Sequence, residues 1–174
     1  MASLTASQKT TLKNFILADP VLSLLPLNTD SYFTMALALN ATASPDYWVW
    51  KSSLRKHDLT DQASDVGTVF DWGTAAGNFI SRSQGERDCW AQVWNSSLTV
   101  NPSAQNVRDA FANIFSGSGA GAVNNRNHFT ALARRKATIA EKLLASGTGS
   151  TASPATSGFE GTLSYTDIQG VMES

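Results

Sequence analysis

Three short motifs of the form Ser/Thr-x-x-Glu/Gln mark where helices can begin in this chain of 174 residues. They start at Thr5, Ser83 and Thr138. In such a capping box the hydroxyl accepts a hydrogen bond from a backbone N–H one turn later, and the Glu or Gln side chain accepts one from the first residue. Apolar residues at helical spacing follow each motif. The motifs therefore predict helices, and the chain is predicted to be mainly α.

Other start signals extend this helical prediction. Asn28 precedes apolar residues at helical spacing over 32–39, and Asn101 precedes the strongest amphipathic pattern of the chain. The aromatic run at 47–50 suits a strand by propensity. The Ser-Pro-Asp start at 44–46 nevertheless favours a helix there, because proline suits the first turn of a helix.

Two glycine-containing stretches are interpreted from their composition. Residues 72–80 keep apolar residues at helical spacing despite two glycines, so we expect a helix there. Residues 117–122 contain only Gly, Ser and Ala. This composition predicts a flexible loop, with a further helix over 127–135.

The character of the chain changes after residue 145. Residues 146–158 contain only Ser, Gly, Thr, Ala and one Pro, so they cannot bury apolar area and are predicted to form a linker or an extended arm. The segment beyond them carries four apolar side chains suited to binding a partner: Phe159, Leu163, Tyr165 and Ile168. Two alternatives stay open, since the segment either folds back onto its own domain or adds to a partner's surface. The predicted architecture is a compact multi-helix bundle over 1–145 with an extended C-terminal arm over 146–174.

Composition excludes several classes of protein. The net charge is -1 and only 16% of residues are charged, whereas a dedicated nucleic-acid binder shows a strongly basic balance. No apolar run approaches the roughly 20 residues that span a bilayer, and no basic, apolar leader opens the chain, so we expect neither a membrane span nor a secretory signal. The single cysteine excludes an internal disulfide framework.

Few residues suit catalysis or metal binding. The two histidines, His57 and His128, are far apart in sequence, and Cys89 lies in a predicted helix, where a free cysteine is most often a small buried residue. Asp58, Asp61 and Asp65 have a spacing that places three carboxylates on one helix face, but they lack the alternation and terminal Glu of a calcium loop. We predict no enzyme activity, no cofactor and no metal, and an acidic surface that faces solvent or a partner.

Basic residues gather in a different part of the chain. They are Arg126, Arg134, Arg135, Lys136 and Lys142, with Glu141 as the only acidic residue among them. Three interpretations stay open for this stretch: contacts to nucleic-acid phosphates, a basic helix end favoured by the helix dipole, and an ion-pair surface for an acidic neighbour. The tail beyond residue 143 carries Glu160, Asp167 and Glu173 and no basic residue. Opposite charges in these two parts of one chain favour head-to-tail contacts between copies, which close into rings where the rotation permits.

Five tryptophans, at positions 48, 50, 72, 90 and 94, are candidates for one aromatic core cluster. The alternative is a platform for stacking bases or sugars. The tryptophans have no accompanying basic residues or sugar-binding carboxylate pattern. A core role is therefore favoured.

Several short stretches occur in a distinctive order. They are Leu4-Thr-Ala-Ser-Gln with Ala18-Asp-Pro, Ser44-Pro-Asp-Tyr-Trp-Val-Trp-Lys, Asn101-Pro-Ser-Ala-Gln-Asn-Val-Arg-Asp-Ala-Phe, and Arg135-Lys-Ala-Thr-Ile-Ala-Glu-Lys-Leu continuing through Ser153-Pro-Ala-Thr to Phe159-Glu-Gly. This order resembles a family of small structural proteins encoded in tailed-bacteriophage genomes. The resemblance runs from Leu4 to about Gly161, and residues 52–80 carry little of it.

The resemblance implies a place in the virion neck, assembled after synthesis in the host cytoplasm. Size, helical body and C-terminal arm look like a head-to-tail adaptor, a ring of twelve copies beneath the portal that binds the portal through its arms and carries tail or nozzle proteins. DNA would pass through the channel without sequence-specific binding. The alternatives are another virion role, in tail completion or capsid decoration, and a small DNA-binding protein that uses the basic stretch.

Overall fold

The computed structural model describes residues 4–95 and 98–174, and it is mainly α-helical, as predicted. The chain forms two compact units. Unit 1 contains the residues up to Val49 together with Lys136–Ser150 and Ala155–Ser174, and unit 2 contains Trp50–Arg135 together with Thr151–Pro154. Unit 2 is therefore inserted into the sequence of unit 1. The predicted division at residue 145 does not match these units, because the two ends of the chain share one core.

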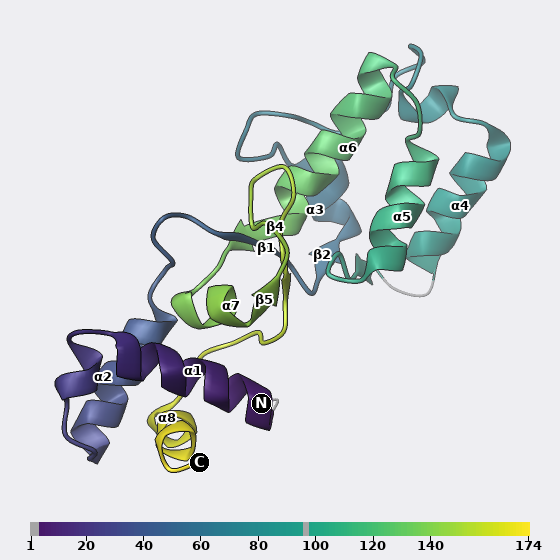
Figure 1. Cartoon of the computed structure of the whole chain (residues 1–174). Helices are drawn as coiled ribbons and strands as arrows, with labels where there is room; N and C mark the ends of the chain where they lie inside the picture. Colours follow the sequence, from purple (N-terminus) through teal and green to yellow (C-terminus); the bar gives the residue numbers. More distant parts are fainter. Residues whose placement is uncertain (1–3, 96–97) are drawn as a thin grey trace. The chain divides into compact units, whose positions relative to one another are not determined.

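Unit 1 is built around three helices. They are α1 (Ala6–Ala18), α2 (Thr29–Asn40) and α8 (Tyr165–Met172). Figure 1 shows α8, in yellow, beside α1 and α2, in purple and blue. A 3-10 turn, η1 (Leu22–Leu24), joins α1 to α2, and the short helix α7 (Ile139–Leu144) packs against both helices.

Local capping sets where these helices start. Thr5 and Gln8 form the predicted capping box of α1, and the Asn28 side chain accepts a hydrogen bond from the backbone of Ser31 at the start of α2. The predicted box at Thr138 begins α7. Helix α8 begins with a further capping box, in which Ser164 is the cap and Asp167 the residue three positions later.

The core of unit 1 joins both ends of the chain. Leu12 and Ile16 of α1 are buried with Leu39 of α2 and Ile168 of α8. The Asn40 side chain fastens the segment before α8 to the end of α2, because it accepts from the Leu163 N–H at 2.9 Å and donates to the Leu163 carbonyl at 2.8 Å. The C-terminal segment thus packs on its own unit in this structure.

Short strands complete the backbone pairing. In the described residues they form three two-stranded sheets: β1 (Trp48–Trp50) with β4 (Arg134–Lys136), β2 (Leu54–Arg55) with β3 (Thr99–Val100), and β5 (Ala145–Ser146) with β6 (Thr156–Ser157). The β2–β3 and β5–β6 pairs are antiparallel, with Leu54 opposite Val100 and Ala145 opposite Ser157. Part of the predicted flexible linker therefore has a paired backbone.

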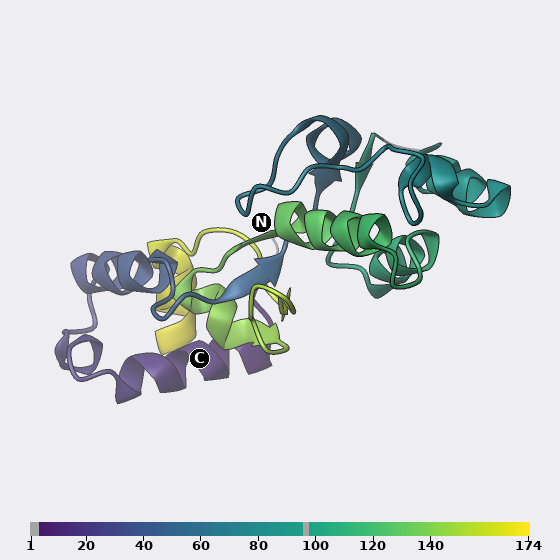
Figure 2. The same ribbon diagram turned by 90° about the horizontal axis from the view of Figure 1, so that it is seen from above.

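Unit 2 contains the remaining helices. They are α3 (Lys56–Asp61), the 3-10 turn η2 (Phe79–Ser81), α4 (Gln84–Asn95), α5 (Gln105–Ile114) and α6 (Ala120–Ala133). Figure 2 shows α6, in green, with the teal helices of the same unit. The capping box predicted at Ser83 begins α4, since the Ser83 N–H donates to Glu86 at 2.7 Å.

The core of unit 2 is aromatic. Phe111 of α5 stacks on Phe129 of α6 with ring centroids 4.0 Å apart, and Trp90 of α4 packs edge-on against Phe111. Trp90 and Trp94 are buried, which confirms their predicted core role. Trp48 belongs to unit 1. The five tryptophans therefore do not form one cluster.

Three local predictions were wrong. Residues 48–50 form a strand, because the Trp48 N–H donates to the Gly149 carbonyl and the Trp48 carbonyl accepts from Ala155. Residues 72–80 contain turns and only the start of η2. Helix α6 begins at Ala120, inside the predicted loop, and its second residue, Gly121, lies directly against the Asn78 side chain, where a Cβ would not fit.

Candidate functional site

The candidate nucleophile and histidines occupy separate settings. His128 is fully buried, with Nε2 2.8 Å from the Leu59 carbonyl and Nδ1 3.2 Å from the Thr68 hydroxyl. Burial lowers the pKa of His128. His57 is exposed and pairs with Asp61 at 2.6 Å, while Cys89 is half-buried in α4. Within residues 4–95 and 98–174, no group of three or more His, Cys, Asp or Glu side chains is arranged to hold a metal ion.

Among the described residues, no helix combines the length and the apolar character needed to cross a membrane.

The three predicted acidic residues do not share a helix face. Helix α3 ends at Asp61, so Asp65 lies in the following loop, and the expectation of three aligned carboxylates was wrong. Asp58 pairs with Arg55 at 3.0 Å. Asp65 pairs with Arg134 at 3.1 Å. Each carboxylate therefore has a partner within unit 2, and the hydrogen bonds from Thr60 and His57 lower the pKa of Asp61.

The predicted basic residues are also distributed among separate contacts. Arg134 is 7% exposed at its side chain and donates to both oxygens of Asp65. Arg126 donates to the carbonyls of Phe115 and Gly117 just beyond α5. Arg135 is half-buried. In unit 1, Lys136 lies 2.8 Å from Asp46 and over the Trp48 ring.

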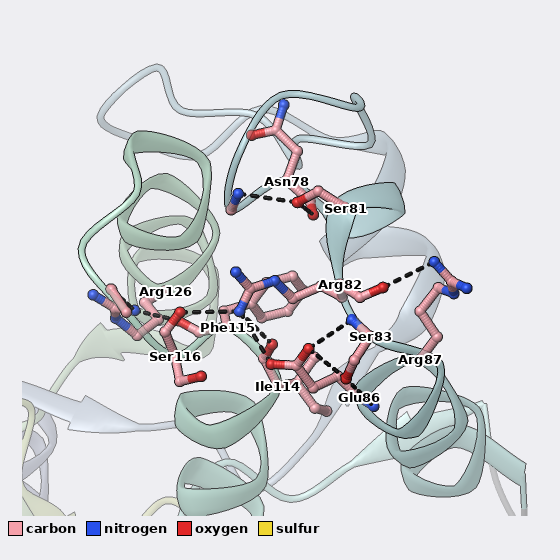
Figure 3. Close-up of polar contacts among 12 residues, drawn as sticks. Asn78, Ser81, Arg82, Ser83, Glu86, Arg87, Ile114, Phe115, Ser116 and Arg126 are labelled. Atoms are coloured by element: carbon pink, nitrogen blue, oxygen red, sulfur yellow. Dashed lines mark hydrogen bonds and ion pairs between the residues drawn. The ribbon is translucent and has the colours of Figure 1, made fainter.

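Two arginines, Arg82 and Arg126, bind backbone carbonyls at the end of α5 (Figure 3). Sequence reasoning missed this arrangement. Arg82 donates to the carbonyls of Ile114 and Ser116 at 3.2 and 2.9 Å, and it pairs with Glu86 at 3.2 Å. The last carbonyls of a helix have no partner within the helix. Arg82 and Arg126 therefore satisfy the carbonyl oxygens at this helix end, which is a structural role. The only sequence signal near this arrangement was the capping box at Ser83.

The four C-terminal residues predicted to bind a partner have different accessibilities. Leu163 and Ile168 are buried in the core of unit 1, and Phe159 is half-buried against it. Tyr165 is 36% exposed and packs on Phe33 of α2, with ring centroids 4.6 Å apart. Tyr165 and Phe159 are thus accessible in this structure, whereas Leu163 and Ile168 would have to leave the core.

Unit 1 carries a group of exposed apolar side chains, here named the α1–α2 apolar surface. Its members are Leu17, Val21, Leu24, Leu27, Phe33, Leu37 and Tyr165. Leu24 is 82% exposed and Leu37 is 75% exposed. Single exposed apolar residues are normal, whereas contiguous ones mark interaction sites. Within this group Phe33 and Tyr165 are in direct contact. Sequence reasoning predicted a partner contact for Tyr165 alone among these residues and did not identify the others as a surface.

The segment that carries most of this surface, residues 17–37, contains Asp19 and Asp30 and no basic residue, although Lys13 of α1 lies one helical turn before Leu17. No Lys, Arg or His occurs between Lys13 and Lys51, whereas Asp19, Asp30 and Asp46 do. Asp19 accepts from the backbone N–H groups of residues 21 and 22, each at 2.9 Å. These hydrogen bonds lower the pKa of Asp19, so the carboxylate is charged at neutral pH.

Unit 2 has its own exposed apolar segment, here named the 66–80 apolar loop. Its exposed side chains are Val66, Val69, Trp72 and Ile80. The loop is held at both ends, because Asn124 of α6 donates to the Val69 carbonyl at 2.9 Å and Arg87 of α4 donates to the Ile80 carbonyl at 2.9 Å.

Comparison with known proteins gave no relative. No family model, curated protein or solved structure is significantly similar to this chain. The interpretation of function therefore depends on the surfaces described above and on the sequence resemblance.

Proposed function

We propose that this chain is a structural virion protein of a tailed phage, a head-to-tail adaptor that forms a ring beneath the portal and links it to the tail. The observation that carries the proposal is the α1–α2 apolar surface, which includes Leu24 and Leu37. Large exposed apolar side chains on a folded unit are suited to binding protein. The ordered stretches that resemble phage structural proteins support the same role.

The C-terminal segment is the proposed portal contact. Tyr165 and Phe159 offer aromatic area without unfolding unit 1. Leu163 and Ile168 would join them only if α8 left the core to act as the extended arm. Such release exposes their apolar area and therefore needs compensating burial on the portal.

Another virion position, in tail completion or capsid decoration, would use the same kind of exposed apolar surface and is the second candidate.

DNA binding through the basic stretch is supported less well. Arg134 is committed to Asp65, and Arg126 to the end of α5. Strong salt-dependent binding of the chain to duplex DNA would favour the DNA-binding role.

The test uses purified portal protein from the genome that encodes this chain. We expect immobilised portal to capture the wild-type chain, and Tyr165→Ala to weaken capture about tenfold, the loss of one aromatic contact at an interface. Leu98→Ala, at a 77% exposed position in unit 2, is the matched control and should bind like wild type. Localisation to the capsid lattice or the tail tube in intact particles, without portal capture, would overturn the proposal.

A further inference from the structure

We infer that a pocket in unit 2 binds a small zwitterion of the free amino acid class. The inference goes beyond the proposed function and does not depend on it. Three observations carry it: the size of the pocket, the hydrogen bonds that its polar groups already make, and the balance of charge at its edge.

The pocket belongs to unit 2 alone. Its volume is about 280 Å³, and its lining includes Val66, Thr68 and Arg134. Asn127 and Thr130 of α6 also line it, and they are three residues apart, so they lie on one face of that helix. Drug-sized ligands occupy pockets of roughly 300–1,000 Å³. This pocket therefore suits a molecule of only a few heavy atoms.

The hydroxyl of Thr68 can only accept a hydrogen bond from a ligand. His128 Nε2 lies 2.8 Å from the Leu59 carbonyl, which cannot donate, so Nε2 carries the hydrogen. Because burial lowers the pKa of His128, the ring is neutral at pH 7 and Nδ1 is an acceptor. The Thr68 hydroxyl, 3.2 Å from Nδ1, therefore donates its hydrogen to His128. Ser64 lies 2.6 Å from the Thr68 oxygen and takes one of its two lone pairs, which leaves the other for a ligand.

The hydroxyl of Thr130 is restricted in the same way. It donates to the Arg126 carbonyl one helical turn earlier, at 3.0 Å. Two hydroxyls of the pocket lining thus have their hydrogens in use within unit 2, and each can only accept from a ligand. An ammonium group has three donors and no acceptor, so it is the ligand group that matches them.

Arg134 gives the pocket the opposite polarity at another point of its lining. A guanidinium has donors only, and its planar fork matches a carboxylate. The Arg134 side chain is 7% exposed and is held by Asp65 at 3.1 Å. Because Asp65 lies against Arg134, an anion meets one attraction and one repulsion there, and so does a cation. A ligand without net charge is therefore favoured.

A free amino acid has these properties together. Its ammonium only donates, its carboxylate only accepts, and its net charge is zero. A polyol is the main alternative, but each of its hydroxyls both donates and accepts, so it makes no use of the separation between acceptor-only and donor-only groups.

The experiment is a titration of the isotope-labelled full chain, followed by the backbone amide signals in NMR spectra. Glycine is the probe, and acetate and methylammonium, which carry one end of it each, are tested separately. We expect glycine to shift the amides of residues 66–68 and 127–134 and to saturate with a Kd on the order of 1 mM, the range for a ligand of so few heavy atoms. Acetate and methylammonium should each bind at least about tenfold more weakly.

Variants at Thr130 test the acceptor-only hydroxyl. Thr130→Val keeps the shape of the side chain and should weaken glycine binding about tenfold, whereas Thr130→Ser keeps the hydroxyl and should bind like wild type. Thr34→Val is the matched control, because the Thr34 hydroxyl makes the same bond to the carbonyl one turn earlier, at 3.0 Å, in unit 1. It should leave glycine binding unchanged.

The amide spectrum of each variant reports whether it folds. Asn127 is exposed, so Asn127→Ala should fold and should weaken glycine binding about fivefold, and it decides the question if Thr130→Val does not fold. Shifts that do not saturate with glycine, acetate or methylammonium binding as tightly as glycine, or an unchanged Kd for a folded Thr130→Val would each overturn the inference. Tighter binding of glycerol than of glycine would overturn it as well, because the pocket would then be a polyol site.

Discussion

The guanidinium of Arg134 donates to both carboxylate oxygens of Asp65, each at 3.1 Å, although the two residues are 69 positions apart in the sequence. The arginine side chain is 7% exposed and the aspartate side chain 48% exposed. The pair ties the strand after α6 to the loop after α3. The sequence predicted that Asp65 faces solvent or a partner and left three roles open for Arg134, and here the two residues bind each other.

Removing the carboxylate charge from this pair should destabilise unit 2. Asp65→Asn leaves the buried Arg134 charge without its anion, and because Asp65 is half-exposed we expect a loss of about 1–2 kcal/mol, below the value for a fully buried pair. Urea unfolding followed by tryptophan fluorescence measures it, since four of the five tryptophans lie in unit 2. Asp61→Asn, in an exposed pair with His57, should change stability by less than about 0.5 kcal/mol. Equal effects of the two variants would contradict the assigned role.

The stability of unit 2 should fall in mild acid because of His128. Burial keeps the folded pKa of His128 below its ordinary value of 6.5. Below pH 6.5 the unfolded chain therefore binds more protons than the folded chain. The contribution of neutral His128 to the free energy of unfolding is complete above this pH. It is lost as the pH falls from the unfolded pKa to the folded pKa, and the loss levels off below the folded pKa.

Unfolding experiments between about pH 7.5 and pH 5 check this dependence. His128→Gln keeps an N–H donor for the Leu59 carbonyl but cannot titrate, so it should lose less stability than wild type across the range. His57→Gln measures what the exposed histidine contributes. An identical pH dependence for wild type and His128→Gln would refute the expectation.

The C-terminal helix should be necessary for the stability of unit 1. Ile168 is fully buried in its core, so Ile168→Ala should cost about 2–4 kcal/mol. Tyr165→Ala, at a half-exposed ring pair, should cost less than about 1 kcal/mol. Hydrogen exchange of α1 and α2 reports the difference, and an Ile168→Ala variant as stable as wild type would show instead that the segment is a free arm.

The start of α6 should not accept a side chain at Gly121. A Cβ there would overlap the Asn78 side chain, which is itself buried and donates to Asp71 at 2.6 Å. Gly121→Ala should therefore cost about 1–3 kcal/mol. Gly85→Ala in α4 is the control, because nothing lies within 4 Å of its Cβ position, and alanine should raise stability by about 0.5 kcal/mol. Thermal unfolding of both variants tests whether Gly121→Ala lowers stability while Gly85→Ala raises it. If Asn78 moves aside freely, Gly121→Ala would not lower stability.

Helix starts were predictable because a cap depends on residues within one turn. The box at Thr5 and the box at Thr138 both occur as expected. The amphipathic pattern behind Asn101 likewise identified α5, with Phe111 and Ile114 buried. These features need no information from the rest of the chain.

The errors arose where a distant residue decides the local structure. The strand at 48–50 depends on backbone groups of Gly149 and Ala155, about a hundred positions later. Helix α6 begins where Gly121 meets Asn78, and Arg82 binds carbonyls beyond α5. Predicting charged surfaces from the sequence has the same weakness. It groups residues that are neighbours in sequence, and so it cannot show that Arg134 forms an ion pair with the distant Asp65.

The insertion of unit 2 into unit 1 has a consequence during translation. Helices α1 and α2 are synthesised first, but the helix that completes their core, α8, is synthesised on the order of ten seconds later at ordinary elongation rates. Residues 50–135 emerge in between and can build their own aromatic core. A chain that stalls before α8 would therefore carry a finished unit 2 and an open unit 1, with Leu12, Ile16 and Leu39 exposed to proteases and chaperones.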